Sequence, residues 1–249
     1  MKKPLAISFI DIKTLCVEGK LSSLLDVHHV LVIKAHAKDF VLKTEQLFAA
    51  MSPREKERCE RISLKAVALR YLIYRGLLRF LLGLLINEAP KDVELAVGKY
   101  GKPSLKSGND LTFNLSHTDD IVIYTFSKHG EIGVDVERKD AKFSSLNVAD
   151  LYLTDGEKIH VLALSLDKQM PFLVKLWTKK EAISKAFGLG LNMNLKSLDL
   201  SHFEPGHDLM FKFGEDYCHL AEISNLADHY ASVALIERRD NILFHQKKP

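Results

Sequence analysis

Residues 111–137 read LTFNLSHTDDIVIYTFSKHGEIGVDVE, and this stretch decides the class of fold. It contains three apolar runs, rich in β-branched and aromatic residues, which predict strands at 111–115, 121–126 and 132–136. The polar run SKHGE at 127–131 fits a hairpin connection between the last two strands. Strands that cluster in this way, instead of alternating with helices, favour an α+β fold over a doubly wound sheet.

The segments on either side of this stretch both run in the order strand, helix, strands. Capping boxes, SPRE at 52–55 and TDGE at 154–157, predict helices that reach about residues 85 and 166, the first one broken at Gly76. Another helix is expected from Pro171 to a C-cap at Gly188. A helix at 39–51 and strands at 5–10, 29–33, 93–97, 209–213, 217–223 and 229–236 complete the pattern. We therefore expect two similar, closely packed halves, 1–130 and 131–249.

The composition is that of an ordinary globular protein with one large or two small domains. The chain has 249 residues, of which 47% are hydrophobic, and 35 basic residues against 32 acidic residues give a net charge of +3. High apolar content and low net charge exclude extended disorder, and they argue against a nucleic-acid or membrane partner. A local basic surface for a small anionic ligand is still compatible with this balance.

The cysteines and the apolar runs predict a cytoplasmic location. Three cysteines without a CxxC pair exclude a disulfide framework and a thiolate zinc site, and they suit a reducing compartment. The apolar run at 5–10 is ended by Asp11 before the core of a signal peptide is complete. The longest apolar region, 71–86, contains Arg75 and Arg79 and is too short for a membrane span.

Two carboxylates share one face of the strand predicted at 132–136. Because side chains alternate along a strand, Asp135 and Glu137 point the same way, while Val134 and Val136 point into the core. Neighbouring carboxylates repel each other unless a cation lies between them, and oxygen ligands favour Mg²⁺. The alternative interpretation is a solvated strand face beside Arg138.

The helix predicted after Pro171 contains the segment WTKKEAISK at 177–185. Trp177, Glu181 and Lys185 are four residues apart and therefore share one helix face, with Lys180 beside them. In the functional interpretation, Glu181 adds a third carboxylate to the strand pair and the lysines meet phosphate oxygens. In the simpler interpretation, Glu181 and Lys185 form a surface ion pair that stabilises the helix by about 0.3–0.5 kcal/mol.

Three further segments contain polar or basic side chains that could bind an anionic ligand. FNLSHT at 113–118 places Ser116 and His117 at a strand end, and the absence of a GxSxG elbow argues against a serine hydrolase. The turn KYGKP at 99–103 presents Lys102. Forked guanidinium groups are preferred partners of phosphate, and the 52–85 region carries six of them. They belong to Arg54, Arg58, Arg61, Arg70, Arg75 and Arg79. Each segment also has a simpler interpretation as a turn or a solvated helix face.

Taken together, these segments resemble the 4′-phosphopantetheinyl transferases of the large, surfactin-synthetase-activating type. The resemblance extends from about residue 52 to residue 191, and it depends on the joint order and spacing of short motifs. The motifs are Ser52-Pro53, Arg70, Gly101-Lys102-Pro103, Phe113-Asn114-Leu115-Ser116-His117, Gly133-Val134-Asp135-Val136-Glu137 and Trp177-x-x-Lys180-Glu181-Ala182-x-x-Lys185. The resemblance implies a pseudo-dimer of two similar α/β halves with the active site in the cleft between them.

The resemblance also implies an enzyme, a holo-[acyl-carrier-protein] synthase. It would transfer 4′-phosphopantetheine from coenzyme A to a serine of an acyl, peptidyl or aryl carrier protein and release adenosine 3′,5′-bisphosphate. Mg²⁺ or Mn²⁺ would be the metal, and coenzyme A the co-substrate. Carrier proteins of this kind are acidic helical bundles, and residues 146–153 with the helix from Asp155 are candidates to receive one. A pseudo-dimer holds one complete cleft, so we expect a monomer.

By the same resemblance, Asp135, Glu137 and Glu181 hold the metal against the pyrophosphate. Glu181 is also the candidate base for the attacking serine, directly or through a metal-bound water, and Lys185 and His117 complete the catalytic set. The phosphates, pantetheine arm, adenine and 3′-phosphate of coenzyme A would be bound by a larger group. It consists of Arg58, Arg70, Gly101, Lys102, Pro103, Ser116, His117, Lys180 and Lys185.

Two other functions use the same residues. A Mg²⁺-dependent hydrolase of nucleotide pyrophosphates would need the carboxylates but no protein acceptor. A non-catalytic binder of coenzyme A or of nucleic acid would keep its affinity after the carboxylates are removed, and the nucleic-acid version requires a steep salt dependence.

Overall fold

The computed structural model describes residues 5–12, 20–106, 110–141, 149–201 and 208–237, and it shows a mixed α/β fold. The helices are α1 Lys20–Val27, α2 Thr44–Ala50, α3 Pro53–Glu60, α4 Lys65–Ile86, α6 Asp155–Ala163 and α7 Leu166–Phe187. The strands are β1 Ile7–Asp11, β2 Val30–His36, β3 Leu95–Val97, β4 Pro103–Leu105, β5 Thr112–Thr118, β6 Ile121–Ser127, β7 Gly130–Arg138, β8 Leu209–Phe213, β9 Asp216–Ile223 and β10 His229–Glu237. Short 3₁₀ helices lie at Ala37–Lys43, Gly190–Asn192 and Leu195–Ser197.

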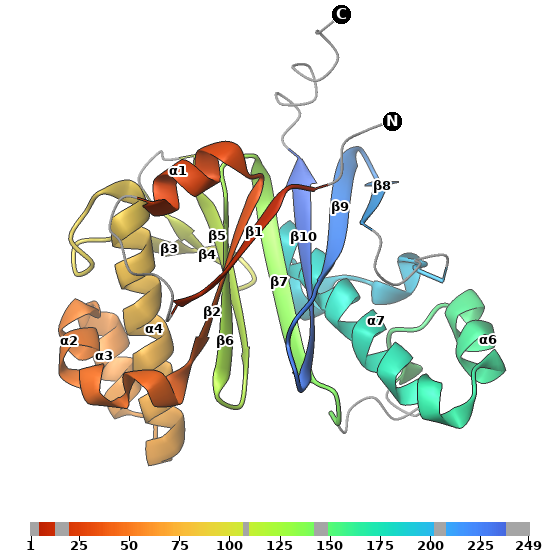
Figure 1. The fold of residues 1–249 in the computed structure, drawn as a ribbon, viewed down its shortest axis with the longest axis horizontal. Helices are drawn as coiled ribbons and strands as arrows, with labels where there is room; N and C mark the ends of the chain where they lie inside the picture. The colour runs from red at the N-terminus through yellow and green to blue at the C-terminus, as the bar shows by residue number, and fades with distance from the viewer. Residues whose placement is uncertain (1–4, 13–19, 107–109, 142–148, 202–207, 238–249) are drawn as a thin grey trace, which may run out of the picture.

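The strands form two four-stranded sheets in the middle of the molecule and a separate hairpin of β3 and β4 (Figure 1). The first sheet has the order β1-β2-β6-β5 and the second has the order β7-β10-β9-β8. Only β1 and β2 pair in parallel among these described strands. Every residue of β6 is buried, because apolar clusters cover both of its faces.

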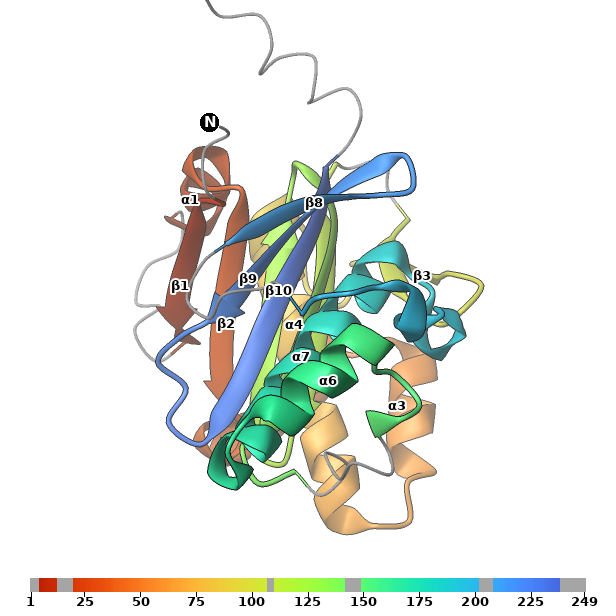
Figure 2. The ribbon, with the colours of Figure 1, turned by 90° about the vertical axis from the view of Figure 1, so that its right-hand side faces the viewer.

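Alternation along the strands builds three layers of apolar side chains. In β2, Leu31 and Ile33 pack with α4 on the outer face of the first sheet, while Val30 and Val32 pack between the sheets. Val134 of β7 lies in the same inner layer. The outer face of the second sheet carries α6 and α7, as the view from that side shows (Figure 2). The order of layers is therefore helix, sheet, sheet, helix.

The edge strands β5 and β7 bring the two sheets together beside several of the predicted site residues. Each stands at the end of its own sheet, and they pack against each other. The side-chain oxygen of Asn114 on β5 accepts a hydrogen bond of 3.1 Å from the backbone N–H of Val134 on β7. A buried amide that satisfies a strand-edge donor ties the sheets together where β7 has no backbone partner on that side.

The helix boundaries correct one prediction and confirm another. The chain breaks between α3 and α4 at residues 61–64, whereas Gly76 lies inside α4. A Cβ atom at Gly76 would lie 2.6 Å from the Cβ of Leu47, so this glycine allows α2 to approach α4. The predicted C-cap is confirmed, because Gly188 ends α7 in the left-handed conformation with φ 69°. None of the helices in the described ranges is long and apolar enough to span a membrane.

Candidate functional site

The carboxylates of β7 lie on the face that meets α7. Asp135 is 4% exposed and Glu137 is partly buried, while Val134 and Val136 face the layer between the sheets. The strand alternation predicted from the sequence is thus the one observed. Burial, with the nearby carboxylates Asp135 and Glu181, raises the pKa of Glu137 to about 7, against the opposite effects of Lys185 and Trp177. Negative charge is therefore only partly compensated at this face.

Helix α7 brings a further carboxylate, Glu181, to this region. Glu181 is buried, and its pKa is raised by burial and by Asp135 while Lys185 opposes the shift. The ammonium of Lys185 lies 2.6 Å from Oδ1 of Asp135, and the indole of Trp177 forms a hydrogen bond with Glu137. One face of α7 thus meets the two carboxylates of β7.

Gly133 makes this close approach possible. An added Cβ atom would lie 2.1 Å from the carbonyl oxygen of Ala182 and 2.3 Å from the amide nitrogen of Ala186. Both atoms belong to the backbone of α7, so the helix packs directly on the strand. The motif Gly133-x-Asp135 therefore combines the contact surface with the functional group.

The residues present suit a hard divalent cation in their chemistry. The Oδ2 atom of Asp135 and the Oε1 atom of Glu181 are buried without a hydrogen-bond partner. Buried carboxylate oxygens without partners are costly, and Mg²⁺ prefers oxygen ligands. As the side chains lie, no three His, Cys, Asp or Glu residues in the described ranges are gathered closely enough to hold a metal ion.

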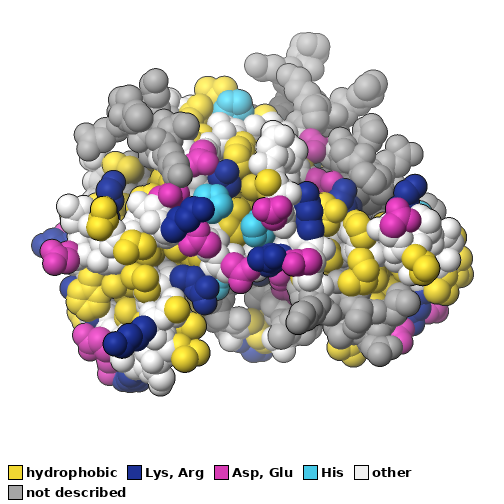
Figure 3. All heavy atoms as spheres, turned by 60° about the horizontal axis from the view of Figure 1, so that its bottom comes forward, with side chains coloured by type: hydrophobic (Ala, Val, Ile, Leu, Met, Phe, Trp, Pro, Cys, Tyr) yellow, Lys and Arg dark blue, Asp and Glu magenta, His cyan; other side chains and the backbone are white. Residues whose placement is uncertain are grey.

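An open cavity of about 1520 Å³ is lined by residues between Ser52 and Asp119, and the three carboxylates are not part of this lining. It reaches His117, whose neighbour Ser116 is hydrogen-bonded to Asp135. Five of the residues predicted to bind coenzyme A line it: Arg58, Arg70, Gly101, Pro103 and His117. Figure 3 shows the molecule with the bottom of Figure 1 turned forward. Acidic, basic and histidine side chains gather in the middle of this face. A cavity of this size with a cationic lining is suited to a large anionic cofactor.

Sequence reasoning missed Tyr74, which also lines the cavity. Its ring lies 4.9 Å from the ring of His117, and its hydroxyl donates a hydrogen bond of 2.8 Å to the carbonyl oxygen of Asp119. Burial, together with Lys185 and Arg70, lowers the pKa of His117, which favours the neutral imidazole. A usable signal was present, because Tyr74 follows Arg70 by one helical turn and shares its face.

Comparisons with known proteins identify the family of the chain. Residues 131–234 match a sequence model of the 4′-phosphopantetheinyl transferase superfamily. The chain is 30% identical over 164 residues to 4′-phosphopantetheinyl transferase Sfp of Bacillus subtilis, covering 66% of this chain and 72% of that protein. The chain belongs to the 4′-phosphopantetheinyl transferases.

Shorter similarities connect this transferase to two further members. It is 34% identical over 95 residues to 4′-phosphopantetheinyl transferase AcpT of Salmonella typhi, covering 38% of this chain and 50% of that one. It is 32% identical over 109 residues to AcpT of Escherichia coli, covering 44% and 55%. The surfactin-activating type expected from the motifs is thus confirmed by the similarity to Sfp.

The structure of this transferase corrects the prediction for Lys180. The side chain is fully buried, and its ammonium donates to Glu157 at 2.7 Å, to the carbonyl of Tyr152 at 2.7 Å and to the carbonyl of Leu195 at 3.0 Å. All three N–H donors are therefore used inside the protein. Burial lowers the pKa of Lys180 and Glu157 opposes this shift. Lys180 connects α7 to α6 instead of reaching a phosphate.

Three more predicted contacts, Lys102, Ser116 and Lys185, lie apart from the described lining of the cavity. The ammonium of Lys102 lies 2.8 Å from Glu131 and 2.8 Å from the carbonyl oxygen of Ala186, so it joins the turn before β4 to β7 and the end of α7. Ser116 is buried against Asp135. Gly101 and Pro103, on either side of Lys102, do face the cavity.

Proposed function

We propose that this transferase moves 4′-phosphopantetheine from coenzyme A to a serine of an acyl, peptidyl or aryl carrier protein. The observation that supports the proposal is the pair of unpartnered carboxylate oxygens of Asp135 and Glu181, which Ser116 connects to a large cationic cavity that reaches its neighbour His117. A reaction at a pyrophosphate requires a cation-binding group next to a pocket for a polyanion. This arrangement supplies both.

In this proposal coenzyme A occupies the cavity. Arg58 and Arg70 bind its 3′-phosphate, and Gly101 and Pro103 border the adenine. His117 and Lys185 face the pyrophosphate, where their N–H groups donate to phosphate oxygens. Bidentate guanidinium–phosphate contacts orient the cofactor as well as binding it.

The metal site consists of Asp135, Glu137 and Glu181. Mg²⁺ or Mn²⁺ bound there would neutralise the charge that develops on the pyrophosphate oxygens. Glu181 accepts the proton of the attacking serine, directly or through a water molecule, and the serine oxygen forms the new bond to the phosphorus of the pantetheine phosphate. The pyrophosphate P–O bond breaks, and adenosine 3′,5′-bisphosphate leaves. Lys185 stabilises the negative charge at this centre.

We also propose that the molecule is a pseudo-dimer of residues 1–130 and 131–249. Each sheet carries one 22-residue helix on its outer face, α4 on the first and α7 on the second. The carboxylates lie on β7 and α7, while the described cavity lining comes entirely from before β7. Both groups of residues belong to one chain, which supports a monomer. The free thiols of Cys59 and Cys218 support a reducing, cytoplasmic location.

The carrier is proposed to dock on α6. Ile159 and Leu162 on this helix, with Leu151 before it and Leu166 after it, are about 70–80% exposed. Adjacent exposed apolar side chains are typical of interaction sites. The helix also lies next to α7, which carries Glu181.

The decisive experiment is the loading of an apo carrier protein, measured by its increase in mass. We expect Asp135→Ala to abolish Mg²⁺-dependent loading from coenzyme A. Asp140→Ala is the matched control, because Asp140 is an exposed acidic residue paired with Arg138. Unchanged loading by Asp135→Ala would rule out the metal site. Rapid release of the bisphosphate without a carrier would instead identify a hydrolase.

A further inference from the structure

The two carboxylate oxygens of Asp135 differ in their contacts. Oδ1 accepts a hydrogen bond of 2.9 Å from the hydroxyl of Ser116 and one of 2.6 Å from the ammonium of Lys185. Oδ2 is buried and has no hydrogen-bond partner. Two donors on one oxygen fix the rotation of the carboxylate, and the other oxygen is left for a ligand.

Ser116 is held in place for this role by the junction between the sheets. It lies on β5, two residues after Asn114, whose side chain accepts from the backbone of Val134. Asp135 follows Val134 on β7, so the two side-chain bonds cross the same junction one after the other. Ser116 is 7% exposed and Asp135 is 4% exposed, which protects the bond from water.

We infer that Ser116 is a positioning residue, which orients Asp135 so that its free oxygen faces the cation of the proposed metal site. This inference rests on the proposed function, in which Asp135 binds the metal. Lys185 faces the phosphates of coenzyme A there, so the neutral hydroxyl of Ser116 is the partner that stays on Oδ1 throughout. The serine thus acts on the metal ligand and does not bind a phosphate.

The test is a titration of the cofactor-free protein with Mg²⁺, followed by fluorescence. Trp177 is the only tryptophan in the chain, and its indole is hydrogen-bonded to Glu137, so it reports directly on this site. We expect Ser116→Ala to weaken Mg²⁺ binding about tenfold, the usual effect of removing a partner of a metal ligand. Binding of coenzyme A in the presence of EDTA should be unchanged.

Ser232→Ala is the matched control. Ser232 lies directly opposite Asp135 on β10 and is equally buried, but its hydroxyl contacts Thr178 at 3.0 Å and not the carboxylate. It should bind Mg²⁺ like the wild type. If Ser116→Ala does not fold, Ser116→Thr and Ser116→Val form a pair of equal size that differs by the hydroxyl. The threonine variant should then bind Mg²⁺ about tenfold more tightly than the valine variant.

Three outcomes would overturn the inference. Ser116→Ala with wild-type Mg²⁺ affinity, or threonine and valine variants of equal affinity, would show that the hydroxyl does not orient the ligand. Loss of coenzyme A binding in EDTA with Mg²⁺ affinity retained would make Ser116 a phosphate contact. If the wild type binds no Mg²⁺, or Asp135→Ala binds it equally well, the proposed metal site fails and the inference fails with it.

Discussion

The ammonium group of Lys180 lies 2.7 Å from the carboxylate of Glu157, and neither side chain is exposed to solvent. Glu157 also accepts from the backbone N–H groups of Thr154 and Leu200, so one carboxylate joins the start of α6, the middle of α7 and the segment after it. The next residue of α7 is Glu181, one of the three carboxylates of the site. The buried ion pair therefore holds the helix that presents a functional group.

Lys180→Met should destabilise the protein by about 3–5 kcal/mol, because it leaves the Glu157 carboxylate buried without a counter-charge. Urea unfolding measures this loss. The double variant Lys180→Met/Glu157→Gln removes both charges and should be more stable than the single variant by at least about 1 kcal/mol. If the double variant instead loses the sum of the unfolding free energies lost by the two single variants, the two side chains do not act as a pair.

Gly133→Ala should separate α7 from β7. The new methyl group would meet the backbone of Ala182 and Ala186 at distances that no packing tolerates, so we expect a loss of about 3 kcal/mol or more. Thermal unfolding and Mg²⁺ titration should both report the change. Gly98→Ala makes the same substitution where the nearest atom is 3.4 Å away, and it should have little effect. Equal stability of the two variants would contradict the packing argument.

Local periodicity explains which parts of the site were predictable. The strand period placed Asp135 and Glu137 together, and the helix period placed Glu181 one turn before Lys185. The same period explains the error at Lys180. Adjacent helix residues are about 100° apart, so a residue next to Glu181 points toward a different neighbour, here α6.

Contacts between distant segments were not predictable from the sequence. The Gly76 break was wrong because a glycine inside a helix can serve packing with another helix, and its local cost of about 1 kcal/mol does not reveal this. Ser116 was correctly placed near the end of a strand, but its partner Asp135 belongs to the other sheet. Only the meeting of β5 and β7 brings them together.

Arg70→Ala should raise the KM for coenzyme A about tenfold or more, because it removes a charge-assisted contact to phosphate worth about 1.5–3 kcal/mol. The value of kcat should change less, since Arg70 lies away from the reacting phosphorus in the proposed complex. Arg61→Ala is the control, because Arg61 is exposed and pairs with Glu57 outside the described lining. Similar KM values for the two variants would remove Arg70 from the cofactor site.

A negative charge added to α6 should weaken binding of the carrier protein and leave binding of coenzyme A unchanged. Leu162→Glu removes an exposed apolar contact and repels an acidic carrier, so we expect the KM for the carrier to rise about tenfold. The affinity for coenzyme A should be unchanged. Leu42→Glu alters an even more exposed leucine on the first half of the chain and should leave both values as in the wild type. A normal carrier KM for Leu162→Glu would place the docking surface elsewhere.

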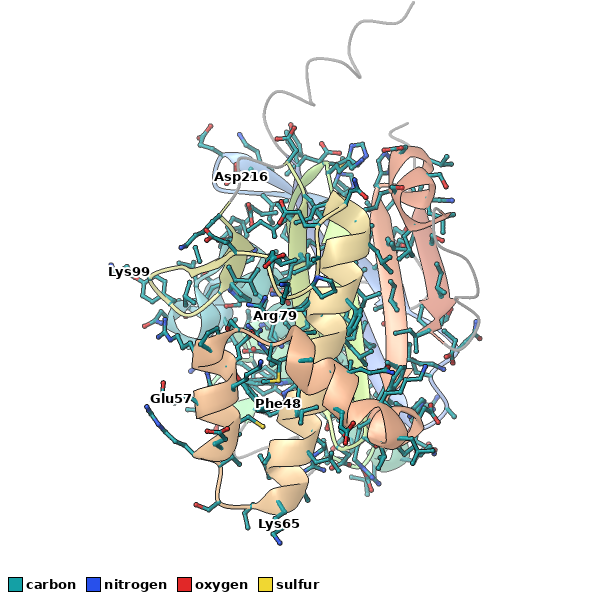
Figure 4. All side chains as sticks on the ribbon, turned by 90° about the vertical axis from the view of Figure 1, so that its left-hand side faces the viewer. Phe48, Glu57, Lys65, Arg79, Lys99 and Asp216 are labelled. Atoms are coloured by element: carbon teal, nitrogen blue, oxygen red, sulfur yellow. The ribbon has the colours of Figure 1, made fainter. Side chains whose placement is uncertain are left out.

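Glu55 should control stability in acid, because it pairs with Arg75 and with the buried Arg79 of α4. Figure 4 labels Arg79 on this helix. Burial raises the pKa of Glu55, but Arg75, the backbone of Ser52 and Arg79 outweigh burial and lower the pKa below its ordinary value of 4.5. Its stabilising contribution is therefore complete above about pH 4.5 and is lost as the pH falls through the lowered folded-state pKa.

Glu55→Gln should cost about 3–5 kcal/mol at pH 7, since it leaves the guanidinium of Arg79 buried without a counter-ion. The difference from the wild type should shrink as the pH falls below 4.5, because the wild type then loses the same charge. Urea unfolding at pH 7 and at pH 3 measures both effects. Glu57→Gln, at an exposed position on the same helix, should cost less than about 0.5 kcal/mol and keep the pH dependence of the wild type. A constant difference between Glu55→Gln and the wild type across this pH range would show that the carboxylate charge does not stabilise the contact between α3 and α4.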